Sequence, residues 1–201
     1  MAIIVRKQGR RTLTLISPDG SDRRQLSPAI DVSSASWSPD AKWIIASGKD
    51  SKGEGLFKIP VDGGDTQRLV DGVTSNPVWS PDASVIAYTG PVSGPIGSLL
   101  IIRPDGSAVT SPTIRIRVNT EHYRFVPGTR RLVYVPTPTQ VDPEHFWLLD
   151  LDSMKTRQIS SFDIRSTNRT FDVMPDGSGI VFDRQRENSD LVLIDLPNKN
   201  K

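Results

Sequence analysis

Short apolar runs recur along the whole chain, and turn-forming residues separate them. The motif Trp-Ser-Pro-Asp at residues 37–40 returns at 79–82, and in reduced form at 125–128 and 173–176. Its prolines lie 42, 46 and 48 residues apart, a period that indicates a repeat architecture. Proline presets the backbone of a tight turn and aspartate bonds its own backbone, so each copy predicts a turn between two strands, A and B. The A runs are 34–37, 76–79, 123–126 and 170–173, and the B runs are 43–46, 85–88, 132–135 and 180–182.

A second turn repeats out of phase with the first. It lies at 17–20, 61–64, 103–106 and 151–154, and its aspartates are 43, 43 and 47 residues apart. Apolar strands lead into it and short polar strands follow it, which favours tight hairpins between strands C and D. One repeat therefore contains four antiparallel strands in about 43 residues, which are the strand count and size of a β-propeller blade.

The predicted fold is all-β: a β-propeller of four-stranded antiparallel blades, with about four and a half blades in one domain. The first unit lacks strand A and the last lacks strand D, so we expect an incomplete ring, with closure of 2–6 against 191–196 as the alternative. Terminal units without a neighbour expose apolar faces, which favours self-association through the open ends. These end units contain Leu13, Leu15, Leu191, Val192 and Leu193. The units are a partial blade at 1–30, blades at 31–72, 73–118 and 119–165, and a partial blade at 166–201, with wide loops at 91–97 and 136–144.

Composition narrows the function classes. The 201-residue chain has no cysteine, which excludes disulfides, thiolate metal sites and a cysteine nucleophile. Its net charge of +2 is too small to indicate nucleic acid, and we expect no nucleic-acid contact. No apolar run approaches the roughly 20 residues of a membrane span, and residues 1–11 do not have the order of an export signal. The compartment stays unassigned: cytoplasmic for the chain as given, periplasmic within an exported parent.

The four turn copies resemble the repeat of the TolB-like, WD-like β-propeller family, in which an aromatic residue, Ser-Pro-Asp-Gly and an apolar strand follow one another. Alanine replaces the turn glycine at Ala41 and Ala83, and the copy at 125–128 keeps the aromatic, the proline and a glycine. More narrowly, the chain resembles the C-terminal propeller of large bacterial multidomain proteins, where the propeller follows a protein-kinase or winged-helix domain. That resemblance implies a sensing or protein-interaction module without catalysis.

The sequence lacks the patterns of a catalytic or metal site. No Gly-x-Ser-x-Gly nucleophile elbow occurs, and only His122 and His145 could act as an imidazole base. Two histidines 23 residues apart do not make a zinc site, and the turn aspartates match no calcium loop. We therefore expect no enzyme activity, no metal and no cofactor.

Two tryptophans occupy equivalent positions in the repeat. Trp37 and Trp79 end successive A strands, so we expect both to be buried between blades. The alternative is an exposed aromatic platform for nucleic acid or sugar.

Arginines gather near one predicted mouth of the central channel. Five fall within residues 115–131, and two more follow in the loop before the last strand A. Strand A is innermost in a propeller, and the D–A loops surround one mouth, where arginine suits acidic side chains or a peptide carboxylate. The alternative is ordinary solvated arginine on edge strands. The predicted binding rim comprises Arg165, Arg169, His122, Arg124 and Asn76.

Three interpretations of function follow. The first is a non-catalytic propeller that binds a protein or peptide, as the C-terminal sensing or scaffold part of a larger bacterial regulator. The second is the accessory propeller of a serine hydrolase or peptidase whose catalytic domain lies outside this chain. The third is a structural repeat with no ligand. A neighbouring kinase or winged-helix domain would favour the first, and an adjacent α/β-hydrolase the second.

Overall fold

The fold was established from a computed structural model that describes residues 1–7, 9–118, 123–137, 144–162 and 170–183. No helix in these ranges is long and apolar enough to cross a membrane. The described residues form seventeen strands and no helix, as expected from the repeat pattern. The strands are β1 (Ala2–Lys7), β2 (Arg10–Ile16), β3 (Arg23–Leu26), β4 (Asp31–Trp37), β5 (Trp43–Asp50), β6 (Gly53–Pro60), β7 (Gln67–Asp71), β8 (Ser75–Trp79), β9 (Ile86–Ser93), β10 (Ile96–Ile102), β11 (Arg115–Arg117), β12 (Tyr123–Phe125), β13 (Arg131–Tyr134), β14 (Trp147–Asp150), β15 (Lys155–Gln158), β16 (Phe171–Val173) and β17 (Ile180–Phe182).

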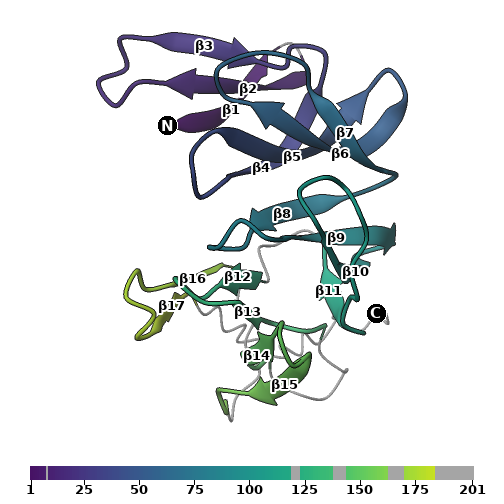
Figure 1. The fold of residues 1–201 in the computed structure, drawn as a ribbon, viewed down its shortest axis with the longest axis vertical. Helices are drawn as coiled ribbons and strands as arrows, with labels where there is room; N and C mark the ends of the chain where they lie inside the picture. The colour runs from purple at the N-terminus through teal and green to yellow at the C-terminus, as the bar shows by residue number, and fades with distance from the viewer. Residues whose placement is uncertain (8, 119–122, 138–143, 163–169, 184–201) are drawn as a thin grey trace, which may run out of the picture.

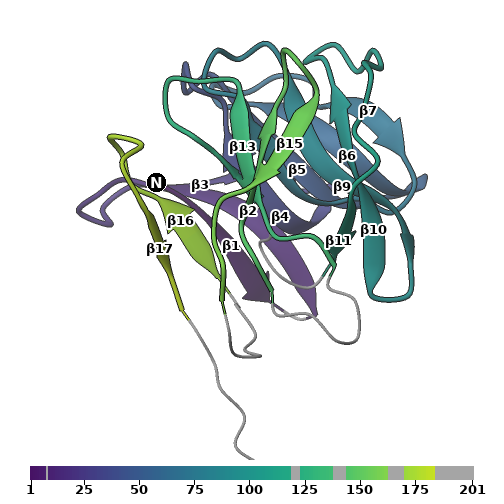
Figure 2. The ribbon, with the colours of Figure 1, turned by 90° about the horizontal axis from the view of Figure 1, so that it is seen from below.

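Five antiparallel sheets follow one another in chain order around an arc (Figures 1 and 2). Three of them have four strands, in the orders β4-β5-β6-β7, β8-β9-β10-β11 and β12-β13-β14-β15. A three-stranded sheet, β1-β2-β3, precedes them and the pair β16-β17 follows. The first strands of neighbouring sheets lie next to each other, since β4 packs on β8, and β12 contacts both β8 and β16. This is the predicted incomplete β-propeller, and the prediction of its fold class is confirmed.

The residues of the Ser-Pro-Asp motif hold each turn together by hydrogen bonds within the turn. In the β4–β5 turn the Ser38 hydroxyl donates to Asp40 Oδ1 over 2.6 Å, and the Trp43 amide donates to Ser38 Oγ over 2.9 Å. Ala41, which follows Asp40, has a φ of 57°, and its backbone amide donates to the Ser38 carbonyl. The β8–β9 turn repeats this arrangement, with Ala83 at a φ of 59°. The repeated aspartates therefore serve turn formation.

The core is divided into layers between adjacent sheets. One layer joins the first two sheets through Leu13, Ile44 and Phe57, and the next joins the second and third sheets. Trp79 belongs to that second layer, is 8% exposed, and packs with Ile45 and Leu56 of the preceding sheet. The predicted inter-blade packing is thus confirmed for Trp79. Trp37 lies in the equivalent place against the first sheet but is only half-buried.

Two predictions about the chain were wrong. The first was that Leu13 and Leu15 contribute to an exposed apolar face of the end unit. Leu13 is 1% exposed and Leu15 packs against the same layer, because that face of the first sheet turns toward the second sheet rather than toward solvent. The segment 91–97 is no wide loop, because β9 and β10 stay paired out to Ser93 and Ile96. Gly94, with a φ of 60°, allows the chain to reverse there within two residues. Self-association stays a prediction, and Leu191, Val192 and Leu193 lie outside the described residues.

Candidate functional site

A groove of about 580 Å³ runs along the inner strands of the arc. Ile4 of β1, serines from β4, apolar residues from β8 and an arginine from β12 form its walls, so it crosses four neighbouring sheets. Each of these strands is the edge strand of its sheet, which directs one row of backbone groups toward the groove. The lining residues are Ile4, Ser33, Ser34, Ala35, Ser36, Asn76, Pro77, Val78, Trp79, Arg124 and Phe125.

Asn76 is fixed at the middle of the groove by contacts to both neighbouring sheets. Its backbone is left-handed, with a φ of 50°, a conformation that asparagine tolerates better than most residues. The backbone amide of Asn76 donates to Ser34 Oγ over 3.0 Å, and the backbone carbonyl of Asn76 accepts a hydrogen bond from the Tyr123 hydroxyl over 2.6 Å. Burial raises the pKa of Tyr123 well above its usual value, which keeps this hydroxyl a neutral donor. The groove floor is therefore rigid where the three sheets meet.

Arg124 supplies the positive charge of the groove. Its Nη1 donates to the Tyr123 carbonyl over 3.1 Å, and its Nε lies 3.8 Å from Asp172 Oδ1 on β16. The Arg124 side chain is 23% exposed, whereas that of Asp172 is 79% exposed. This ion pair is long and its carboxylate is solvated, so it contributes little to stability, and the guanidinium gives the groove a positive charge that suits a carboxylate.

Two residues of the predicted rim, Asn76 and Arg124, line this groove, and their role in binding stays a prediction. His122, Arg165 and Arg169 lie outside the described residues. Sequence reasoning missed Ser34 and Tyr123, whose contacts to Asn76 span 42 and 47 residues. The signal for Ser34 was its position, because Ser34 and Asn76 both stand five residues before the turn prolines of their repeats.

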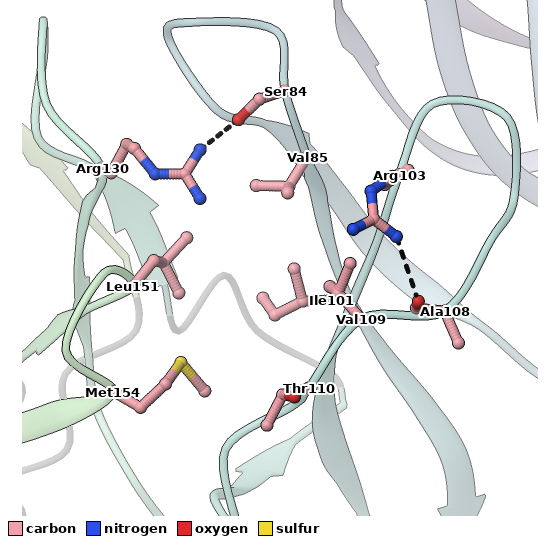
Figure 3. Close-up of a pocket in the computed structure, with 10 residues that line it drawn as sticks. All are labelled: Ser84, Val85, Ile101, Arg103, Ala108, Val109, Thr110, Arg130, Leu151 and Met154. Atoms are coloured by element: carbon pink, nitrogen blue, oxygen red, sulfur yellow. Dashed lines mark hydrogen bonds between the residues drawn. The ribbon is translucent and has the colours of Figure 1, made fainter.

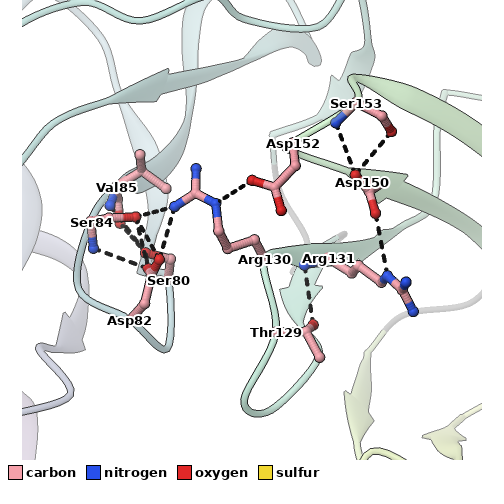
Figure 4. Close-up of polar contacts among 10 residues, drawn as sticks. All are labelled: Ser80, Asp82, Ser84, Val85, Thr129, Arg130, Arg131, Asp150, Asp152 and Ser153. Atoms are coloured by element: carbon pink, nitrogen blue, oxygen red, sulfur yellow. Dashed lines mark hydrogen bonds and ion pairs between the residues drawn. The ribbon is translucent and has the colours of Figure 1, made fainter.

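The other arginines of the predicted cluster point elsewhere. Arg117 lies 3.6 Å from Glu144, which is 6% exposed, and Arg131 lies 3.3 Å from Asp150. Arg130 spans two sheets (Figure 4): its Nη1 lies 2.9 Å from Asp82 and also contacts Ser84, and its Nε lies 2.7 Å from Asp152. These three arginines form ion pairs within the protein, an arrangement that neither the binding rim nor ordinary solvated arginine predicted.

The electrostatics of the Arg130 network follow from these contacts. Partial burial opposes ionisation of Asp82, but hydrogen bonds from Ser80 and Arg130 outweigh it and hold the pKa of that carboxyl well below its usual range. The same hydrogen bond to Asp82, with that to Asp152, raises the pKa of Arg130. The network is a charged clamp between the third and fourth sheets.

A second cavity of about 630 Å³ lies beside this clamp (Figure 3). Its lining combines apolar and polar side chains: Ile101 and Val109 face Leu151 and Met154, and Arg103 and Arg130 stand at its edge. Arg130 is already paired with two carboxylates. The arginine that joins the two sides of this cavity is therefore engaged within the protein.

Chemistry for catalysis is sparse in the described part of the chain. Within it, no three His, Cys, Asp or Glu side chains gather as a metal site would require. His145 accepts the Phe162 amide at Nδ1 over 3.3 Å and stacks on the Phe162 ring, a structural role.

Comparison with known proteins identifies related folds but no family. No protein-family description matches the sequence, and no curated protein does. A TolB from Agrobacterium tumefaciens is 20% identical, with a TM-score of 0.58 over 78% of this chain and 58% of that one. TolB from Acinetobacter baumannii is 18% identical, with a TM-score of 0.64 over 86% and 42%.

Two enzymes of known structure share the architecture. An oligogalacturonate lyase in complex with manganese is 17% identical, with a TM-score of 0.68 over 92% of this chain and 56% of that one. A puromycin-hydrolyzing peptidase from Mycobacterium tuberculosis is 11% identical, with a TM-score of 0.60 over 88% and 34%. The chain spans about half the length of the two TolB structures, and identities this low establish the fold alone.

Proposed function

We propose that this chain, which has the fold of TolB-type β-propellers, is a non-catalytic module that binds an extended peptide segment of a partner protein in its inner groove. The bound segment carries an acidic side chain or a terminal carboxylate that pairs with Arg124. Within a larger bacterial protein, such a module would act as a C-terminal sensing or scaffold domain.

The observation that carries the proposal is the composition of the groove. It combines the Arg124 guanidinium, serine and asparagine side chains, and the apolar surfaces of Val78 and Phe125. Its volume of about 580 Å³ suits a short peptide segment. An arginine that is oriented by a backbone carbonyl recognises carboxylates with directional hydrogen bonds. Edge strands along the groove can meanwhile recognise an extended backbone.

The absence of catalysis is part of the proposal. Catalysis by a nucleophile needs a base within hydrogen-bond reach, and in the described ranges His145 is occupied by the Phe162 amide. Purified protein is expected to hydrolyse no ester, peptide or phosphate substrate above background. An activity that survives repurification and disappears on changing one serine or histidine would contradict this.

A second candidate function is that of an accessory propeller beside a hydrolase domain. The likeness to the peptidase from Mycobacterium tuberculosis favours it, since this chain spans 34% of that protein's length. The neighbouring coding sequence distinguishes the two functions: a kinase or winged-helix domain supports the sensing module, and an α/β-hydrolase supports the accessory one.

Selection of peptides tests the proposed function. A phage-displayed library of random heptapeptides is selected on the purified chain, and dissociation constants of the enriched peptides are measured by fluorescence anisotropy. We expect enrichment of Asp, Glu or a free C-terminus, and at least tenfold weaker binding to the Arg124→Glu variant. Arg157→Glu, an exposed position on the outer strand β15, is the matched control and should bind as the unmodified chain does. Equal binding to both variants, or no enrichment, would contradict the proposal.

A further inference from the structure

The first sheet differs from the others in its innermost strand. The hairpin-closing pair Lys7↔Arg10 of β1–β2 corresponds to Asp50↔Gly53 of β5–β6, exactly one 43-residue repeat later. β1 is thus the counterpart of β5, the second strand of its sheet. In the second sheet β5 has β4 along its inner side, whereas among the described residues β1 pairs with β2 alone.

The hydrogen-bond phase of the β1–β2 ladder shows which backbone groups meet the inner side. Met1 and Ile16 exchange both backbone hydrogen bonds at 2.8 Å. Hydrogen-bonded pairs alternate along an antiparallel ladder, so Ile3 and Val5 direct their amides toward β2. The amides and carbonyls of Ala2, Ile4 and Arg6 therefore face the inner edge, as those of Ile45, Ser47 and Lys49 face β4 in the next sheet.

An apolar notch lies beside this edge. It has a volume of about 240 Å³, and its lining side chains are apolar except for one serine. Ile4 is 39% exposed there, and Trp37 is half-buried, whereas its counterpart Trp79, whose strand β8 packs against β4, is 8% exposed. The lining residues are Ala2, Ile4, Leu13, Ala35, Ser36, Trp37 and Ile44.

The charges at the other end of the edge specify the partner further. In the second sheet, the acidic Asp31 of β4 stands opposite the basic Lys49 of β5. Arg6 is the counterpart of Lys49, and the hairpin tip beside it carries Lys7 and Arg10 as further exposed cations. Directly opposite residues share one face of an antiparallel sheet, so an acid placed opposite Arg6 forms a cross-strand pair.

We propose that the inner edge of β1 binds an extended segment of a partner protein by strand addition. The segment runs antiparallel to β1, with an acidic residue opposite Arg6 and apolar residues opposite Ile4 and Ala2, whose side chains fill the notch. Backbone hydrogen bonds supply affinity in this binding mode, and alternate side chains supply selectivity. This site shares Ile4, Ala35 and Ser36 with the inner groove but does not use Arg124.

The test uses a synthetic probe taken from the chain itself. The probe is a fluorescent, end-capped peptide with the β4 sequence Asp31–Trp37, in which Ser34→Val and Ser36→Val place valines toward the notch. Binding to the full 201-residue chain is measured by fluorescence anisotropy. We expect saturable binding, at least tenfold weaker binding of a probe whose aspartate is changed to lysine, and a reversed preference between the two probes for the Arg6→Glu variant.

Variants of β1 separate strand addition from surface adhesion. Ile4→Pro removes a donor from the inner edge and leaves the β1–β2 ladder intact, so it should abolish binding without loss of cooperative unfolding. Val5→Thr, on the same strand but the opposite face, should bind the probe normally. The proposal is wrong if both probes bind equally or if Ile4→Pro binds the probe normally. It is also wrong if the probe fails to bind and the chain is instead a dimer that Ile4→Pro makes monomeric, because the edge then joins two copies.

Discussion

Single residues in the repeated turns carry a measurable strain. Ala41 and Ala83 adopt φ values of 57° and 59°, at the turn position that Gly20 occupies with a φ of 77°. For an L-residue this left-handed conformation costs about 1–2 kcal/mol, and glycine escapes most of that cost. The departures from the repeat at Ala41 and Ala83 could be recognised in the sequence, but their backbone conformation could not.

Relief of this strain gives the first prediction. Ala41→Gly should raise the free energy of unfolding by about 0.5–1 kcal/mol, because relaxed backbone strain exceeds the entropy that glycine adds to the unfolded chain. The midpoint of urea unfolding measures it. Gly20→Ala is the matched control, since an added Cβ there meets no atom within 4 Å, and it should lower stability by about 1 kcal/mol. Destabilisation by Ala41→Gly would contradict the strain.

Residues of the groove show where sequence reasoning ends. Asn76 and Arg124 were predicted because both belong to A strands, whose place in a propeller follows from the repeat. Tyr123 was missed because its hydroxyl donates a hydrogen bond to the Asn76 backbone carbonyl 47 residues away, a contact that exists only after the sheets are stacked.

At the scale of elements, strands were easier to predict than their surroundings. Alternation and turn residues placed the strands well, but composition suggested a loop at 91–97, where β9 and β10 continue as a bulged hairpin. The burial of Leu13 was missed for a similar reason: period-two alternation separates the two faces of a strand without saying which face meets a neighbouring sheet.

Packing between sheets gives a prediction for the tryptophans. Trp79→Ala should lower the free energy of unfolding by about 3–5 kcal/mol, because its ring fills the layer between the second and third sheets. Trp37→Ala should cost clearly less, since Trp37 is half-buried. Chemical denaturation followed by circular dichroism measures both, and equal losses would show that Trp37 is covered as fully as Trp79.

The Arg130 clamp gives a prediction for contacts between turns. Arg130→Ala should lower stability at neutral pH by about 1 kcal/mol, since one guanidinium joins Asp82 of one sheet to Asp152 of the next. Arg131→Ala is the matched control and should cost less, because its side chain is 55% exposed and has one longer ion pair. Equal effects would show that the clamp does not join the sheets.

The clamp also predicts a pH dependence. The pKa of Asp82 is lower in the folded chain than in the unfolded one, so its stabilisation is complete above its unfolded-state pKa of about 4. That stabilisation is lost as the pH falls toward the folded-state value. The stability difference between the unmodified chain and Arg130→Ala should therefore be constant from pH 7 to about pH 5 and shrink below about pH 4. A difference that grows on acidification would contradict the assignment.

For the whole molecule, the arc explains why binding surfaces gather on its inner side. Three complete sheets stand between two partial ones, so inner edge strands face the space that a longer ring would enclose. The repeat period revealed this architecture from the sequence alone. The partner remained hidden, because the residues that would recognise it come from different sheets and are joined by stacking rather than by spacing along the chain.

Mapping of amide chemical shifts tests the central claim most directly. An acidic peptide selected on the chain is titrated into isotope-labelled protein, whose mass of 22.1 kDa suits two-dimensional NMR. Shifts should concentrate at 33–36, 76, 78–79 and 124–125, the amides around the inner groove, and Arg124→Glu should abolish them. Shifts at 84–85, 101–110 and 151–154 instead, around the cavity between the third and fourth sheets, would place the binding site elsewhere and contradict the proposed function.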